Sequence, residues 1–165
     1  MSKVKLEEIL DALEFAGEEG DYYYNKITGE VVYIGGEEAR IADRDDIDNI
    51  DHYPEWQREI IKDAIDIEEN WDNYISLPSK FDINEYNIMV EFCDSLDNAR
   101  IADQLLNALN GRGAFRKFKD TIIRLNVEKK WYNYRDEALR NVAMDWCKEN
   151  GIEEIDDDRL NIKLV

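Results

Sequence analysis

The 165-residue chain carries 39 acidic and 21 basic side chains, which give it a formal net charge of −18. Its length suffices for one domain with a real core, because 44% of the residues are hydrophobic. This overall charge disfavours duplex DNA and anionic membranes as partners. No apolar run approaches membrane-spanning length, and the N-terminal ten residues do not resemble a signal peptide, so we expect a cytoplasmic protein.

The cysteine and histidine content argues against a disulfide framework and a multi-histidine zinc site. The chain has two cysteines, Cys93 and Cys147, and a single histidine, His52. Both cysteines lie on apolar stripes of predicted helices, as core thiols do. The acidic run that begins at Asp43 is not an EF-hand loop, because Ile47 would occupy the fifth position. We predict no cofactor, no metal site and no catalytic residue.

The N-terminal third of the chain predicts a helix and a β-hairpin. A helix is expected over residues 5–15, with an inward face of Leu6, Ile9, Leu10 and Leu13. The aromatic and β-branched runs 22–25 and 30–34 flank a turn that ends at Gly29, which predicts an antiparallel hairpin. The acidic stretch 37–53 is predicted to be a loop or a mobile connector.

The middle of the chain predicts two helices around a short strand. Pro54 opens the first helix, whose apolar face is predicted to consist of Trp56, Ile60, Ile61, Ala64 and Ile67. The stretch NYISLPS, residues 73–79, is predicted to form a short strand before Pro78. Asp82 then begins a capping box that starts the second helix. Its predicted stripe is Tyr86, Met89, Val90, Cys93 and Leu96.

The remaining sequence predicts three further helices, over residues 100–109, 114–125 and 130–150. Gly111 and Gly113 mark a tight corner between the first two. The predicted inward residues of the second are Phe115, Phe118, Ile122 and Leu125. Gly151 predicts a glycine stop for the last helix. In the tail, Leu160, Ile162 and Leu164 alternate with polar residues and predict a third strand able to add to the hairpin edge.

These elements predict a mostly helical α+β fold: five or six helices, a small antiparallel β-hairpin and a C-terminal third strand. We predict a single domain over residues 1–152, followed by a C-terminal extension over 153–165. Charge divides this domain into an acidic front, residues 1–97, with 27 acidic and 8 basic side chains, and a basic helical section, residues 98–151, with 7 and 11. The basic section either docks on the acidic front within the fold or meets an anionic partner.

The run GRGAFRKFKD, residues 111–120, is the least ordinary segment. Its helical spacing places Arg112, Arg116 and Lys119 along one face, beside the free amides of a helix N-terminus. Cations and open amides together favour a phosphate or carboxylate group. The alternative is that Gly111 merely ends a helix and the cations pair with the acidic front.

Arg135 is the second unusual position, because it lies within the apolar stripe of the last predicted helix. A charge there must pair with a carboxylate or reach a ligand. Tyr132 and Tyr134 lie in the same turn and could stack on bases. The candidate binding residues are therefore Arg112, Arg116, Lys119, Tyr132, Tyr134 and Arg135.

Four segments carry a resemblance to a known family: YYYNKITGEVVYI, YISLPSKFDINEYNIM, GRGAFRKFKD and WYNYRDEALRNVAMDWCKENGI. Together they resemble the bacterial uncharacterised protein family 0158, over residues 4–152. The resemblance implies a cytoplasmic bacterial protein and brings no activity, substrate or cofactor with it.

Three functions remain open at the level of sequence. The preferred one is a non-enzymatic binding or regulatory module that holds an anionic group at the GRGAFRKFKD segment. The second is an acidic interaction module that contacts basic proteins or mimics nucleic acid. The third is a metal-dependent hydrolase that would use Asp120, Glu128 and Lys130, although this acid-then-E-x-K pattern belongs on strands and here straddles a helix end.

Overall fold

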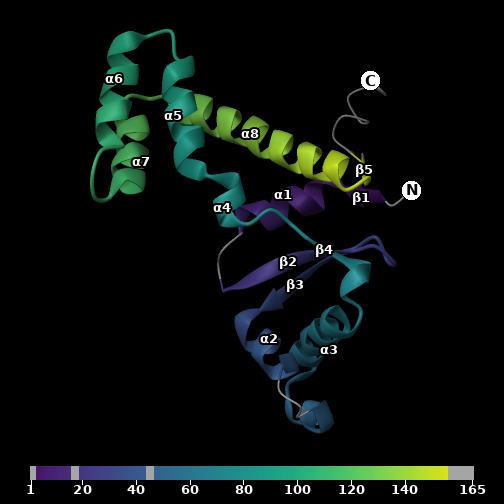
Figure 1. Cartoon of the computed structure of the whole chain (residues 1–165). Helices are drawn as coiled ribbons and strands as arrows, with labels where there is room; N and C mark the ends of the chain where they lie inside the picture. The colour runs from purple at the N-terminus through teal and green to yellow at the C-terminus, as the bar shows by residue number, and fades with distance from the viewer. Residues whose placement is uncertain (1–2, 16–18, 44–46, 156–165) are drawn as a thin grey trace. The chain divides into compact units, whose positions relative to one another are not determined.

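The computed structural model describes residues 3–15, 19–43 and 47–155. The chain divides into two compact units. Unit 1 comprises Met1–Lys80 and Val142–Val165, and unit 2 comprises Phe81–Asn141. Figure 1 labels the helices and strands of both units.

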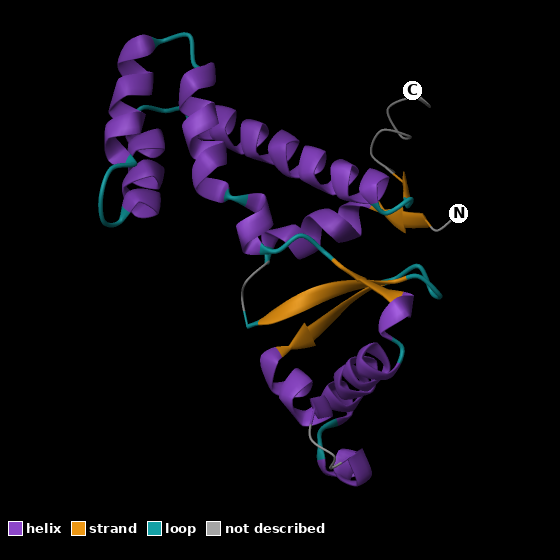
Figure 2. Ribbon diagram, viewed as in Figure 1, coloured by secondary structure: helices purple, strands orange, loops and turns teal. Residues whose placement is uncertain are grey.

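Unit 1 is built on a three-stranded antiparallel sheet with the order β3-β2-β4 (Figure 2). The strands are β2 (Gly20–Asn25), β3 (Val31–Gly35) and β4 (Tyr74–Ser76). Strands β2 and β3 pair with Tyr22 opposite Tyr33, so the predicted hairpin and the predicted short strand are both confirmed. In the turn, Asn25 Oδ1 accepts a hydrogen bond from the amide of Ile27 at 2.9 Å, and Gly29 has a φ of 76°.

One face of this sheet is covered by the helices α2 (Gly36–Asp43) and α3 (Glu55–Glu69) (Figure 1). Apolar side chains from the sheet and both helices form the core between them. Its buried residues are Ile34, Ala42, Ala64, Ile67 and Tyr74. The 3-10 turns η1 (Ile47–His52) and η2 (Trp71–Asn73) precede and follow α3. Burial of this apolar face supplies the main driving force for packing α3 on the sheet.

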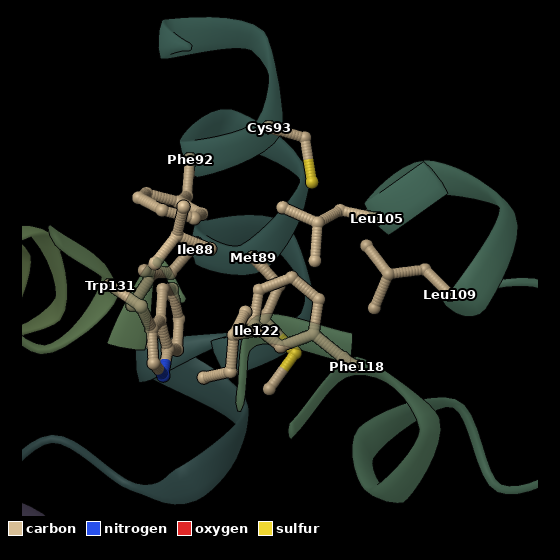
Figure 3. Packing of buried hydrophobic residues seen from close by; sticks show 10 residues of the cluster. Ile88, Met89, Phe92, Cys93, Leu105, Leu109, Phe118, Ile122 and Trp131 are labelled. Atoms are coloured by element: carbon tan, nitrogen blue, oxygen red, sulfur yellow. The ribbon is translucent and has the colours of Figure 1, made fainter. Parts of the chain in front are cut away.

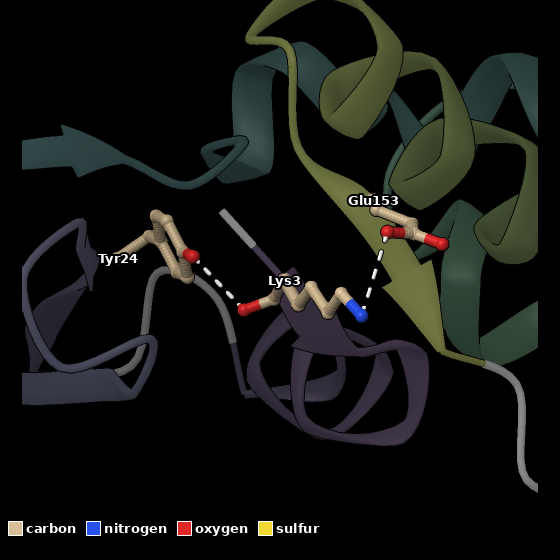
Figure 4. Close-up of polar contacts among 3 residues, drawn as sticks. All are labelled: Lys3, Tyr24 and Glu153. Carbon is tan, nitrogen blue, oxygen red and sulfur yellow. Dashed lines mark hydrogen bonds and ion pairs between the residues drawn. The ribbon is translucent and has the colours of Figure 1, made fainter. Parts of the chain in front are cut away.

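The other side of unit 1 holds helix α1 (Leu6–Glu14) and a two-stranded parallel sheet of β1 (Lys3–Lys5) and β5 (Glu153–Ile155). Figure 4 shows how polar contacts join these parts. The Tyr24 hydroxyl donates to the Lys3 carbonyl oxygen at 2.9 Å, and the Lys3 ammonium lies 3.9 Å from a Glu153 carboxylate oxygen. Trp146 packs edge-on against Tyr24 and donates from Nε1 to the Ser76 carbonyl at 3.0 Å.

Unit 2 is helical and has an aromatic core (Figure 3). After the short α4 (Lys80–Ile83) it contains α5 (Glu85–Ser95), α6 (Ala99–Ala108), α7 (Ala114–Arg124) and the first part of α8 (Glu128–Glu149). Phe92, Phe118 and Trp131 come from three different helices and are all buried. Their ring centroids lie 5.0–6.3 Å apart in edge-on contacts, a favourable arrangement of aromatic quadrupoles.

Two helices end in left-handed stops. The predicted stop at Gly151 is confirmed by its φ of 66° and by the hydrogen bond from the Ile152 amide to the Cys147 carbonyl at 2.8 Å. An equivalent stop, which the sequence pattern did not predict, follows α7. There Asn126 has a φ of 58°, and the amide of Val127 donates back to the carbonyl of Ile122 at 2.9 Å.

The prediction of a loop or mobile connector over residues 37–53 is wrong for its described parts, which form α2 and η1. Helix α2 is acidic, yet Ala42 and Glu38 are both buried. The Glu38 carboxylate accepts a hydrogen bond from the side-chain amide of Gln57 at 3.2 Å. A polar side chain can therefore face the interior here, which the hydrophobic pattern alone does not reveal.

Several predicted faces and caps shift by a residue or two. Trp56 is 66% exposed, and Gln57 takes the inward position with Ile61 and Ala64. Helix α5 is capped by Asn84, whose side chain accepts from the amide of Asn87, and not by Asp82. The buried residues of α5 are Ile88, Met89, Phe92 and Cys93. Tyr86, which was predicted to lie on the buried face of this helix, is exposed.

Strand β5 pairs with β1 and not with the edge of the hairpin. It lies at residues 153–155, before the predicted tail strand. Residues 160, 162 and 164, on which that prediction rested, lie outside the described residues. Among the described residues, no helix has the length and apolar character that a membrane span requires.

Candidate functional site

The GRGAFRKFKD segment forms a glycine corner and the first two turns of α7. Gly111 and Gly113 have φ angles of 78° and 71°, as the predicted tight corner requires. A Cβ atom at either position would meet nothing within 4 Å, so the glycines are needed for their backbone conformation and the space around them is open. Helix α7 starts at Gly113 without a side-chain cap, which leaves its first-turn amides free of a side-chain acceptor.

Three of the predicted binding residues come together on this element. Arg112, Arg116 and Lys119 are all exposed, and Arg116 and Lys119 lie on the outer side of α7. None of the three forms an ion pair with any residue that the structure describes. The structure therefore gives no support to the idea that these cations serve to neutralise acidic residues within the described fold.

The fourth cation of the segment has a structural role instead. Lys117 donates from Nζ to the carbonyl oxygen of Asn110 at 2.6 Å, just beyond the end of α6. A cation at a helix C-terminus satisfies a carbonyl group and complements the helix dipole. Lys117 thus ties the corner together, whereas its three neighbours point to solvent.

Two large apolar side chains accompany the three exposed cations. Phe115 is 46% exposed and Ile123 is 58% exposed. Both are in α7, and with Lys119 they form a row of positions i, i+4 and i+8 on its outer surface. The prediction that Phe115 is buried is wrong, because Phe118, Thr121 and Ile122 supply the buried face. The sequence contains a pattern that indicates this exposure, because Lys119, a cation, occupies the central position of the i, i+4, i+8 row.

The outer face of α7 and the corner before it therefore form a mixed surface, which we call the basic-apolar face: Arg112, Phe115, Arg116, Lys119 and Ile123. Exposed apolar groups that stand singly need no explanation. Here two of them flank a cation on one helix, and the opposite side of the same helix is fixed in the aromatic core through Phe118.

Arg135 is committed to an internal ion pair. Its Nε lies 2.9 Å from Glu85 Oε1, and the two side chains are 16% and 32% exposed. Of the two alternatives predicted for Arg135, a carboxylate partner or a ligand, the structure shows a carboxylate partner, the first residue of α5. The short charge-assisted contact joins α8 to α5 within unit 2. Arg135 is thus part of the scaffold that positions the helices.

The two tyrosines predicted for the site have different environments. Tyr134 packs on the edge of the core, with its ring centroid 5.5 Å from that of Phe92. Burial raises the pKa of its hydroxyl, helped by the nearby charges of Glu91 and Asp94. Tyr132 is half exposed on α8 and is available to solvent.

The residues of the hydrolase alternative lie on helices. Asp120 is exposed on α7, while Glu128 and Lys130 are in the first turn of α8. The described residues contain no group of three or more histidine, cysteine or carboxylate side chains able to hold a metal ion. The two cysteines are buried, and burial is the main cause that raises the pKa of each thiol to about 11.

Comparison with known proteins now places the chain. Residues 3–164 match the model of an uncharacterised protein family, UPF0158, and the chain belongs to this family. The matched range includes most of the residues that the sequence analysis set apart as an extension.

One curated relative is the UPF0158 protein PA5073 of Pseudomonas aeruginosa, which is 31% identical to this chain over 67 residues. That alignment covers 40% of this chain and 44% of the relative, so the chain matches less than half of the relative's length. No solved structure matches the chain.

Proposed function

We propose that the protein is a non-enzymatic binding module whose basic-apolar face on α7 holds an anionic partner. One observation carries the proposal: Arg112, Arg116 and Lys119 project from one corner and helix, and none of them forms an ion pair with a described residue. Exposed cations that are not used within a fold are free to attract an anion.

Two features of the corner add to this. The first turn of α7 offers amides without a side-chain cap, at the positive end of the helix dipole. Lys117 already satisfies the carbonyl of Asn110, so the remaining cations are not needed to close the corner. The partner must approach unit 2 rather than unit 1, because unit 1 carries all of the net negative charge.

The charge count supports this division. Of the 39 acidic and 21 basic side chains, 10 of each lie in residues 81–141. Unit 2 is therefore neutral overall. The 29 acidic and 11 basic side chains of unit 1 account for the net charge of −18. At physiological salt the repulsion from unit 1 is screened beyond about 8 Å.

The test is a matched pair of triple variants of the full chain. Arg112→Gln/Arg116→Gln/Lys119→Gln removes the three candidate cations. Arg124→Gln/Lys129→Gln/Lys130→Gln removes three other exposed cations of unit 2. Binding is measured by fluorescence anisotropy with labelled poly-L-glutamate and with a 12-nucleotide oligouridylate.

We expect the wild type and the control to bind at least one of these probes, and the first variant to lose about tenfold or more in affinity. For the oligonucleotide, three phosphate contacts predict a slope of about −2 in a plot of log K against log salt concentration. Absence of binding by the wild type to both probes, or equal loss in both variants, overturns the proposal.

A second function is favoured by the concentration of negative charge in unit 1. We propose, as the alternative, that unit 1 contacts a basic protein. Poly-L-lysine binding that survives the α7 triple variant, together with no binding to either anionic probe, is the result expected of this alternative.

A further inference from the structure

The apolar half of the basic-apolar face indicates what kind of anion it receives. Phe115 and Ile123 stand eight residues apart, about 12 Å along the helix axis at 1.5 Å per residue. Lys119 lies between them, Arg116 is next to Phe115 in the first turn of α7, and Arg112 lies in the corner that precedes the helix. The face therefore alternates apolar and cationic groups over a little more than two helical turns.

A phosphate chain would use only part of this face. Base stacking needs aromatic rings, and Phe115 is the one aromatic side chain of α7 that is exposed. Ile123 is an aliphatic side chain and has no ring on which a base could stack. It is nevertheless more exposed than Phe115, at 58% against 46%. An aliphatic group of this kind gains most from contact with other apolar side chains.

A helical polypeptide can contact the whole basic-apolar face, both its apolar and its cationic side chains. A helix that packs along α7 presents an apolar side chain about once per turn, at i, i+4 and i+7, so its stripe is long enough to contact both Phe115 and Ile123, which stand eight residues apart. Acidic residues beside such an apolar stripe would meet Arg112, Arg116 and Lys119. The inner side of α7 is held by the contact of Phe118 with Trp131, so the outer face is presented by a rigid element.

We infer that the anionic partner of α7 is an acidic amphipathic helix of another protein, which packs its apolar stripe on Phe115 and Ile123 and its carboxylates on the three cations. This inference rests on the proposed function, and it names the partner class of the same site. The free energy then has an apolar part that is insensitive to salt and an ionic part that is sensitive to it.

The probe is an 18-residue peptide of glutamate, alanine and leucine, with its leucines at positions i, i+4, i+7 and i+11. One control peptide has the same composition with the leucines spread around the helix. A second has lysine in place of glutamate. Each carries a fluorophore, and binding to the full-length protein is followed by anisotropy, with oligouridylate as a parallel probe.

Two apolar variants of the protein separate the partner classes. Phe115→Gln/Ile123→Gln removes the apolar row and leaves every charge in place. Ile27→Gln/Phe81→Gln is the matched control, because both of these side chains are exposed elsewhere, at 73% and 94%. Ile123→Gln alone repeats the test with the more exposed position if the double variant is destabilised.

We expect the acidic amphipathic peptide to bind the wild type about tenfold more tightly than its scrambled control, and binding of the lysine peptide to unit 1 to be unchanged in the apolar variant. The apolar variant should lose about tenfold for the amphipathic peptide and remain within twofold for poly-L-glutamate and oligouridylate.

Equal binding of the amphipathic and scrambled peptides, or an apolar variant that binds the peptide like wild type, overturns the inference. If oligouridylate binds and the peptides do not, the partner is a nucleic acid strand, and the proposed function stands without this inference. If no anionic probe binds, both fail.

Discussion

The cores of the two units differ in composition. Unit 1 uses a three-stranded sheet and admits polar groups to its interior, such as the Glu38–Gln57 hydrogen bond and the contact of the Tyr74 hydroxyl with the Asp66 carboxylate. Unit 2 has no strand among its described residues and buries an apolar cluster centred on aromatic rings. Unit 1 carries the whole net charge, while unit 2 is neutral and gathers cations on one helix face.

This difference indicates which unit is better suited to select a particular binding partner. In unit 1, charge is spread over many elements, and strongly charged surfaces of that kind favour solubility without selecting one partner. In unit 2, a few exposed cations are held on a helix whose other side is fixed. If the two units also differ in stability, a substitution that destabilises one unit should leave the other unit folded.

The largest effect is expected from Phe118→Ala. Phe118 is fully buried and contacts both Phe92 and Trp131, so its truncation should cost about 4 kcal/mol of the free energy of unfolding. Each unit holds one buried free thiol, Cys93 in unit 2 and Cys147 in unit 1, and burial raises the pKa of both to about 11. At pH 8 these thiols stay protonated, and an alkylating reagent reports the opening of each unit.

In Phe118→Ala we expect alkylation of Cys93 to accelerate by two to three orders of magnitude, with little change at Cys147. Mass spectrometry of peptides resolves the two sites, and Ile61→Ala in unit 1 is the reciprocal control. Equal acceleration of both cysteines in both variants would show that the units open as one.

A smaller loss is expected from Gly20→Ala in the sheet of unit 1. A Cβ at Gly20 would lie 2.3 Å from the carbonyl oxygen of Ile34 and 2.8 Å from the Cα of Gly35, and backbone atoms of the neighbouring strand cannot move aside cheaply. We expect a loss of about 3 kcal/mol, the upper end of the range for overpacking.

Gly113→Ala is the comparison for Gly20→Ala, because its space is open and only its φ of 71° is unfavourable for alanine. Its cost should be about 1 kcal/mol. Both are measured by urea denaturation followed by circular dichroism. A Gly20→Ala variant as stable as Gly113→Ala would mean that the two strands can separate at this pair without penalty.

Arg135→Ala is expected to cost about 2 kcal/mol, between the values for exposed and fully buried ion pairs, because its side chain is 16% exposed and that of Glu85 is 32% exposed. Arg135→Lys should recover part of the loss, since an ammonium cannot reproduce the directed Nε contact. A double-mutant cycle with Glu85→Gln isolates the pair. A coupling energy near zero would mean that Arg135 stabilises the fold through packing alone and not through the ion pair.

An effect as small as that of Gly113→Ala is expected from Asn98→Ala at the start of α6. The Asn98 side chain accepts hydrogen bonds from the amides of Arg100 at 3.1 Å and Ile101 at 3.3 Å. Its loss should cost about 1 kcal/mol, and Asn98→Asp should retain most of the stability. Thermal unfolding measures both, and an aspartate variant as unstable as the alanine variant would argue against capping as the cause.

The hairpin and the six long helices could be predicted because their signals are local. The aromatic and β-branched runs around Gly29 determine the hairpin, and the glycines at 111, 113 and 151 mark chain reversals that other residues rarely adopt. Left-handed Asn126 was missed because asparagine also fits many other turns.

The parts that could not be predicted depend on contacts distant in sequence. Strand β1 is three residues long and gains its hydrogen bonds from β5, some 150 residues later. Burial of Glu38 requires Gln57 on another helix. Exposure of Phe115 follows from which side of α7 the aromatic core takes, and the periodicity of α7 allowed either Phe115 or Thr121 at the boundary.

The pairing of β1 with β5 has a consequence for synthesis. Unit 2 is encoded as one continuous stretch, residues 81–141, inside the sequence of unit 1. Lys3 and Glu153 are partners in register, so unit 1 lacks its closing strand until the residues of β5 have left the ribosome. Domains fold as units while the chain emerges at about 5–20 residues per second. Unit 2 can therefore fold first, whereas unit 1 is completed after it, although residues 1–80 of unit 1 precede unit 2 in the sequence.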